Sequence, residues 1–167
     1  MVLVLVDLQK RFFIEPHPTA ERSRDLQLPQ IINLLTLFRN AGRLVVFVLH
    51  DGPARGTAIP EGETDPLDGI SILPGEIVVR KKHMNGFNGT DLAERIRGTG
   101  ADTVLICGMY AEHCAMATYW GAWDCGLSPF MAKGALIAFR EESLESVYGL
   151  CRTYDEEEVR ENLSSMT

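Results

Sequence analysis

The sequence predicts an α/β fold, a three-layer α-β-α sandwich in which helices cover both faces of a central, mainly parallel sheet of six strands. Strand-like and helix-like stretches alternate along the chain, which is the pattern of parallel strands joined by crossover helices. The runs at 1–6 and 43–49 are almost entirely apolar, as strands covered on both faces should be. The 167 residues suit one domain, and no linker or repeat divides 1–167.

Six short apolar runs are the expected strands. They lie at about 1–6, 43–49, 76–80, 102–107, 128–131 and 149–154. Helices are expected at about 29–41, 91–97, 112–125, 141–148 and 156–164. In the first helix, apolar residues recur with helical spacing from Ile31 to Phe38. Before the last helix, Asp155 and Glu158 have the spacing of a capping box.

Two longer segments are expected to be loops. The polar stretch 8–28 contains Pro16 and Pro18 and should flank the end of the first strand. The stretch 51–75 holds five Gly and four Pro. Because loops of this length in compact domains are usually functional, we expect 51–75 to cover the crevice at the strand ends and to help define the substrate.

Composition and charge exclude several classes of function. Hydrophobic residues make up 46% and charged residues 23%, as in ordinary globular proteins. The net charge of -7 argues against a nucleic-acid or anionic-membrane surface. No apolar run approaches the ~20 residues of a membrane span, and no secretory signal opens the chain, so we expect a cytoplasmic protein. No Gly-x-Gly-x-x-Gly follows a strand, so we predict no dinucleotide and no other cofactor.

Reactive side chains follow three of the expected strands. Asp7 follows the first strand, a basic group containing Lys81 follows the third, and Cys114 follows the fourth after a short turn. Side chains at the carboxyl ends of parallel strands converge on one crevice. The pattern therefore indicates an activated cysteine nucleophile, although spacing alone leaves open whether Lys81 or Lys82 takes part.

Cys114 is the candidate nucleophile because it lies in the first turn of a helix that follows a strand. Helix N-termini stabilise a thiolate, and a nearby lysine should lower the thiol pKa further. Asp7 is then the general base. The other three cysteines, Cys107, Cys125 and Cys151, are interpreted as small buried hydrophobic residues.

Three motifs in order resemble one known family. The first is the apolar run that ends in Asp7 and Gln9, with Phe12 or Phe13 close behind. The second is the segment 81–92, KKHMNGFNGTDL, and the third is the segment 108–114, GMYAEHC. Together they resemble the isochorismatase-like cysteine hydrolases, a superfamily that includes nicotinamidases, N-carbamoylsarcosine amidases and ureide hydrolases, and the resemblance covers nearly the whole chain.

The resemblance implies a Rossmann-like fold and a catalytic triad of Asp7, Lys81 and Cys114, and it favours Lys81 over Lys82. It implies cleavage of a C–N bond in a small amide, carbamoyl or ureide substrate through a thioester on Cys114. It also implies a cis peptide bond between Met109 and Tyr110 that completes an oxyanion hole. The residues expected to line the substrate pocket are Gln9, Phe12, Phe13, Phe87 and His113.

The sequence departs from the family pattern at the place where nicotinamidases hold a metal. That place has His50 and Asp51 with no second histidine nearby, so we predict no metal and favour nicotinamidase less. Isochorismate-cleaving members lack the nucleophilic cysteine, which makes that reaction less favoured too. After the fifth strand, Lys133-Gly-Ala replaces the family's Asp-Ala pair.

Three other functions are weighed against the hydrolase. A thiol redox or sensor protein would use Cys114 but gives Lys81 and Asp7 no joint task. A phosphotransfer enzyme would need a second Asp where Gln9 stands. A non-catalytic family member would more often have lost one of the three residues. The expected partners are a small-molecule substrate and further copies of the chain, as a dimer or tetramer, with Trp120 and Trp123 on a plausible contact helix.

Overall fold

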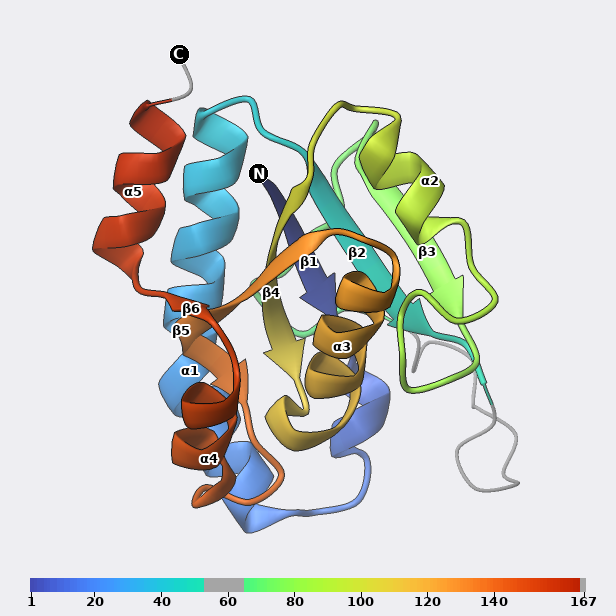
Figure 1. The fold of residues 1–167 in the computed structure, drawn as a ribbon. Coiled ribbons are helices and arrows are strands. Elements are labelled where there is room, and N and C mark those ends of the chain that lie inside the picture. Colours follow the sequence, from blue (N-terminus) through green and yellow to red (C-terminus); the bar gives the residue numbers. More distant parts are fainter. Residues whose placement is uncertain (53–64, 166–167) are drawn as a thin grey trace.

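A computed structural model, which describes residues 1–52 and 65–165, has the predicted three-layer architecture (Figure 1). The central sheet contains six parallel strands in the order β3-β2-β1-β4-β5-β6. The strands are β1 (Val2–Val6), β2 (Val45–His50), β3 (Ile77–Lys81), β4 (Thr103–Met109), β5 (Ser128–Ile137) and β6 (Thr153–Tyr154). The chain thus builds one half of the sheet from β1 to β3 and then the other half from β4 to β6.

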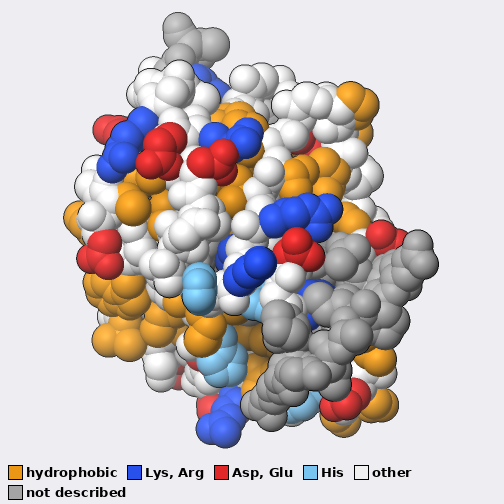
Figure 2. Space-filling view, turned by 90° about the vertical axis from the view of Figure 1, so that its right-hand side faces the viewer, with side chains coloured by type: hydrophobic (Ala, Val, Ile, Leu, Met, Phe, Trp, Pro, Cys, Tyr) orange, Lys and Arg blue, Asp and Glu red, His pale blue; other side chains and the backbone are white. Residues whose placement is uncertain are grey.

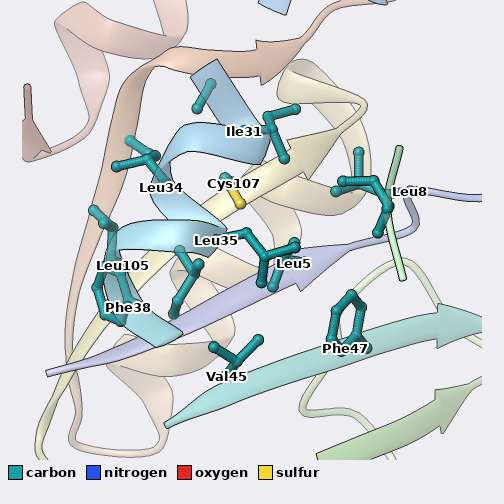
Figure 3. Close-up of a cluster of buried hydrophobic side chains, with 14 of the residues drawn as sticks. Leu5, Leu8, Ile31, Leu34, Leu35, Phe38, Val45, Phe47, Leu105 and Cys107 are labelled. Carbon is teal, nitrogen blue, oxygen red and sulfur yellow. The ribbon is translucent and has the colours of Figure 1, made fainter. Parts of the chain in front are cut away.

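Helices cover both faces of the sheet. They are η1 (Lys10–Phe13), a 3₁₀ turn; α1 (Pro18–Asn40); α2 (Leu92–Arg97); η2 (Ala111–Ala115), a π-helical turn; α3 (Met116–Asp124); α4 (Ser143–Leu150); and α5 (Glu156–Ser164). One apolar cluster joins α1 and α5 to the sheet, and a second joins α2, α3 and α4 to its other face. Figure 3 shows the first cluster, in which leucines of α1 pack on β1, and Cys107 lies in this core as predicted.

The first long helix begins eleven residues earlier than predicted, at Pro18 rather than Pro29, so the loop expected over 8–28 was wrong for 18–28. His17 caps the helix because its Nδ1 accepts a hydrogen bond of 3.2 Å from the Ala20 N–H. Proline at the first helical position is favourable because its missing N–H would have no helical partner there. Pro29 lies inside the helix.

Other element boundaries also differ from the prediction. The fifth strand is ten residues long rather than four, and a register irregularity near Ile106 accommodates it. The sixth strand has only two residues, since α4 continues to Leu150. The last helix is correct, and Asp155 and Glu158 form the predicted capping box.

The predicted loop 51–75 includes 53–64, which lies outside the described residues. Its described end returns to the fold beside β1: Pro66 bridges to Gln9, and the Leu67 N–H donates to the Leu8 carbonyl at 2.9 Å. Leu67 and Ile70 are buried in the first apolar cluster. This end of the loop is therefore part of the core.

Two features bear on partners and location. Trp120 and Trp123 of α3 are exposed, at 48% and 43%, and contact with another subunit there stays a prediction. Among the residues that the structure describes, no helix combines the length and the apolar character that crossing a membrane requires.

Candidate active site

The candidate site lies where the order of the strands reverses. β1 is paired with β2 on one side and with β4 on the other, so the carboxyl ends of β1 and β4 flank the switch point of the sheet. Crevices of open α/β sheets form at such points. Asp7 directly follows β1, and η2, which contains Cys114, follows β4. On the face turned 90° from Figure 1, histidine side chains gather in the lower half of the molecule, toward the end where the strands end (Figure 2).

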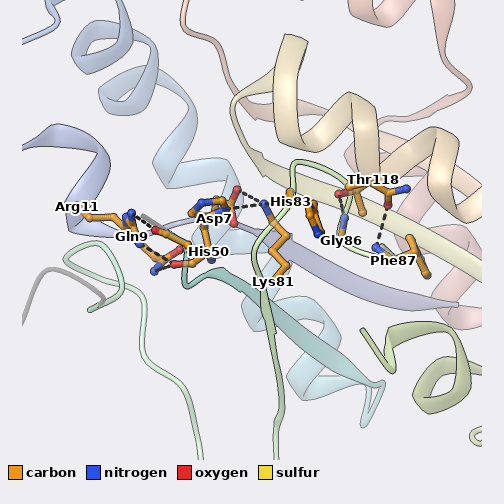
Figure 4. A network of polar contacts seen from close by, with 11 residues as sticks. Asp7, Gln9, Arg11, His50, Lys81, His83, Gly86, Phe87 and Thr118 are labelled. Atoms are coloured by element: carbon orange, nitrogen blue, oxygen red, sulfur yellow. Dashed lines mark hydrogen bonds and ion pairs between the residues drawn. The ribbon is translucent and has the colours of Figure 1, made fainter. Parts of the chain in front are cut away.

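Lys81 and Asp7 form a buried ion pair at this end of the sheet (Figure 4). Lys81 Nζ lies 2.7 Å from Asp7 Oδ2, and each residue is 1% exposed. The same ammonium donates to the His83 carbonyl at 3.0 Å and lies 3.4 Å from His50 Nδ1. A carboxylate, a backbone carbonyl and an imidazole therefore surround this ammonium.

Asp7 is held in an uncommon backbone conformation. Its φ is +53°, a left-handed value that Asp tolerates better than most residues, and its N–H donates to the Val48 carbonyl at 2.8 Å. Burial raises the pKa of the Asp7 carboxyl, an effect that the charge of Lys81 opposes. Oδ1 is buried and has no hydrogen-bond partner of normal geometry among the described residues. One carboxylate oxygen is thus paired and the other is available.

The Cys114 thiol lies close enough to interact with both Asp7 and Lys81. Burial raises the pKa of this thiol to about 12; the Asp7 charge adds to the rise, whereas Lys81 opposes it. Lys81 thus lowers the thiol pKa as predicted, but the predicted net lowering was wrong. The helix N-terminus and the lysine are outweighed by burial and by a carboxylate, so the resting form is the thiol and its reaction requires a base.

The turn before Cys114 contains a cis peptide bond between Met109 and Tyr110, as the resemblance implied. Gly108, just before it, has φ +116°, and a methyl group on it would overlap the backbone of Val6. The Tyr110 hydroxyl donates to the Phe12 carbonyl at 3.1 Å. This contact joins the turn after β4 to η1.

Aromatic rings surround Tyr110. Phe12, Phe13 and the exposed His113, all predicted as pocket residues, have ring centroids 6.1, 6.5 and 6.3 Å from that of Tyr110. Phe139, which follows β5, is nearer at 5.3 Å, and it packs on His17 at 3.9 Å. Sequence reasoning missed Phe139 and His17 because neither belongs to a recognisable motif.

Two predicted pocket residues, Gln9 and Phe87, lie apart from the aromatic rings around Tyr110. The Gln9 side chain is fully buried and pairs with the backbone of His50, accepting from its N–H at 2.8 Å and donating to its carbonyl at 3.2 Å. Phe87 is 9% exposed and packs in the apolar cluster beneath α2 and α3. Arg11, which the sequence analysis also missed, donates to the carbonyls of His50 and Gly52, each at 2.9 Å.

Glu112 is a further residue that the motifs did not single out. Its carboxylate accepts hydrogen bonds from the N–H groups of Phe139 and Arg140, at 3.2 and 2.7 Å. Glu112 lies in the same turn as Cys114, so this carboxylate fastens the nucleophile's turn to the loop that carries Phe139.

Comparison with known proteins identifies the family. The isochorismatase domain model matches residues 1–152. The chain belongs to the isochorismatase family. A streptothricin hydrolase of Streptomyces noursei is 32% identical over 126 residues, which cover 74% of this chain but only 45% of that protein. The chain thus spans less than half the length of this relative.

Solved structures of the isochorismatase family share the fold. An isochorismatase family protein of Desulfovibrio vulgaris superposes with a TM-score of 0.85 at 20% identity, covering 98% of this chain and 97% of the other. An N-carbamoylsarcosine amidase of Thermoplasma acidophilum superposes with a TM-score of 0.74 at 24% identity, covering 92% and 94%. A protein named as an amidase therefore shares the fold of this chain.

Within residues 1–52 and 65–165, no group of three or more His, Cys, Asp or Glu side chains is arranged to hold a metal ion. His50, at the place where some relatives were expected to bind metal, instead faces the Lys81 ammonium. The absence of a metal from the reaction stays a prediction.

Proposed function

We propose that this isochorismatase-family protein is a cysteine hydrolase that cleaves a C–N bond of a small amide, carbamoyl or ureide substrate. Asp7 is the general base, Cys114 is the nucleophile, and Lys81 holds the Asp7 carboxylate in place. The observation that carries the proposal is the state of the Asp7 carboxylate: Oδ2 is paired with Lys81, buried Oδ1 has no hydrogen-bond partner among the described residues, and the Cys114 thiol is close enough to interact with this carboxylate.

In the first half-reaction, Asp7 Oδ1 takes the proton of the Cys114 thiol as the sulfur attacks the carbonyl carbon. The oxyanion is stabilised by the N–H groups of Tyr110 and Cys114. The C–N bond then breaks, and the Asp7 carboxylic acid returns the proton to the leaving nitrogen. The products of this half-reaction are the free amine or ammonia and a thioester on Cys114.

In the second half-reaction, water attacks the thioester carbonyl while Asp7 accepts one of its protons. The C–S bond breaks and the proton returns to the sulfur, so the acid leaves and the thiol is restored. The raised pKa of the Asp7 carboxyl supports this scheme because it makes the carboxylate a stronger base, and the raised pKa of the Cys114 thiol means that the sulfur needs one. The Asp7 carboxylate is thus a stronger base than an ordinary carboxylate, and the Cys114 thiol stays protonated until it attacks a substrate.

The test is a screen of small amides, ureides and carbamoyl compounds for ammonia release, followed by mass spectrometry of the acid-quenched enzyme. We expect a mass adduct of the acyl group on Cys114 with the compounds that are turned over. Cys114→Ala, Asp7→Asn and Lys81→Met should each abolish turnover, whereas Lys82→Met, which changes an exposed lysine beside Lys81, should not.

Turnover by Cys114→Ala would refute the mechanism. A protein that reacts with oxidants at Cys114 but never forms a thioester would instead be the thiol sensor considered above. The adduct therefore separates the hydrolase from that alternative, which simple alkylation of Cys114 does not.

A further inference from the structure

The position of His50 in the sheet distinguishes it from the other residues around the ion pair. Lys81 ends β3 and Asp7 follows β1, and β2 lies between these strands. His50 is the last residue of β2 and is paired in register with Lys81. The lysine must therefore reach over β2 to contact Asp7, across about 10 Å of sheet, and His50 lies on that path.

The backbone of His50 is held by three hydrogen bonds from side chains (Figure 4). Gln9 contacts both its N–H and its carbonyl, and Arg11 donates to the same carbonyl at 2.9 Å. The imidazole is confined as well, because a methyl group on Gly52 would lie 3.0 Å from His50 Nε2. These contacts fix the ring with Nδ1 toward Lys81 Nζ, 3.4 Å away.

The protonation of His50 follows from its neighbours. An ammonium has only donors, so Nδ1 is the acceptor and the imidazole proton lies on Nε2. Burial, which is the largest cause, and the charges of Lys81 and Arg11 together lower the pKa of His50 to about 4; the charge of Asp51 opposes this change, and His83 adds slightly to it. His50 is thus a neutral acceptor at neutral pH.

We propose that His50 is a positioning residue whose Nδ1 accepts a hydrogen bond from the Lys81 ammonium and holds that ammonium between Asp7 and Cys114. The proposal rests on the function proposed above, in which Lys81 holds the carboxylate that acts on Cys114. His50 needs no contact with the substrate for this role. It completes the set of three acceptors around Lys81, together with Asp7 Oδ2 and the His83 carbonyl.

The test measures the rate at which iodoacetamide alkylates Cys114 at fixed pH, with the modified peptide identified by mass. Because Lys81 lowers the pKa of the Cys114 thiol, a displaced lysine leaves less thiolate. Lys81→Met sets the full size of the effect, about tenfold in rate for each unit by which the thiol pKa rises. His50→Leu should slow alkylation by at least half of that effect on a logarithmic scale.

His50→Asn is the matched rescue variant, because the Asn Oδ1 stands one bond beyond Cγ, as Nδ1 does, and accepts without carrying charge. Cys114 of His50→Asn should be alkylated within about threefold of the wild-type rate, because a neutral acceptor is kept. The rate for Lys82→Met should also stay within about threefold, because that variant leaves the site unchanged. Gly52→Ala displaces the imidazole without removing it. As a single variant it should slow alkylation of Cys114, whereas in combination with His50→Asn it should cause no further slowing.

A wild-type rate for His50→Leu, or an equal loss in His50→Asn and His50→Leu, would overturn the proposal. Alkylation does not require substrate, so its outcome is independent of turnover. If the variants alkylate as expected but no amide forms a thioester, the proposed function fails and the role of His50 stands. If Lys81→Met abolishes turnover while His50→Leu alkylates normally, only the role of His50 fails.

Discussion

Lys81 Nζ and Asp7 Oδ2 lie 2.7 Å apart although Lys81 ends β3 and Asp7 follows β1, with β2 between these strands. Both are almost completely buried, and such a pair stabilises a protein little relative to apolar residues of the same size, while loss of one partner is costly. The position of the Lys81–Asp7 pair beside a cysteine thiol suits a chemical role better than a structural one.

Asp7→Asn should lower the pKa of the Cys114 thiol below its value of about 12 while abolishing turnover, because the variant removes a negative charge beside the sulfur and also removes the base. Thiolate absorbance in the ultraviolet, titrated against pH and corrected with Asp7→Asn/Cys114→Ser, measures the change. A midpoint that stays at or above the wild-type value would contradict the electrostatic account of the site.

His50 predicts a pH dependence of stability. Its pKa is about 4 in the folded protein and ordinarily 6.5, so between these values the unfolded chain binds a proton that the folded chain does not. The free energy of unfolding should therefore fall as pH falls from about 6.5 to about 4. In His50→Asn this part of the dependence should vanish, as urea denaturation at several pH values can measure. Superimposable profiles for the two proteins would show that His50 is not held neutral.

The sequence was sufficient to predict the layers of the fold because apolar runs and helical periodicity are local signals. It also named Asp7, Lys81 and Cys114, since each belongs to a motif at a strand end. The choice between Lys81 and Lys82 has a physical basis in the strand itself. β3 continues to Lys81, and side chains alternate along it, so that Val79 and Lys81 are buried and Arg80 is exposed.

What the sequence did not predict depends on tertiary contacts. The thiol pKa is set by the depth of burial and by a carboxylate from another strand, and neither is visible in the local sequence. Phe139 and Glu112 meet only because β5 is longer than its apolar run indicated. The start of α1 was missed because its first turns are polar and its cap, His17, is an uncommon one.

Glu112→Ala should destabilise the loop after β5. The variant leaves the N–H groups of Phe139 and Arg140 without their carboxylate acceptor, which should cost about 1–3 kcal/mol in the free energy of unfolding. Amide hydrogen exchange should accelerate at these two residues, and Glu142→Ala, at an exposed residue in the same loop, is the control. Unchanged protection at Phe139 would mean that Glu112 does not fasten the loop.

Gly108→Ala should be among the most damaging single-methyl substitutions in the chain. The added methyl would overlap the carbonyl oxygen and the amide nitrogen of Val6, and backbone atoms of a central strand cannot move aside as a flexible side chain can. The residue also has φ +116°, where only glycine is at ease. Overpacking and backbone strain together should cost about 2–4 kcal/mol in the free energy of unfolding.

Gly126→Ala provides the matched control, because Gly126 also has a positive φ, +70°, but a Cβ there meets nothing within 4 Å. Chemical denaturation of both variants separates the steric contribution at Gly108 from the cost of the left-handed conformation. Equal losses in the two variants would mean that β1 and β4 can separate to admit the methyl group.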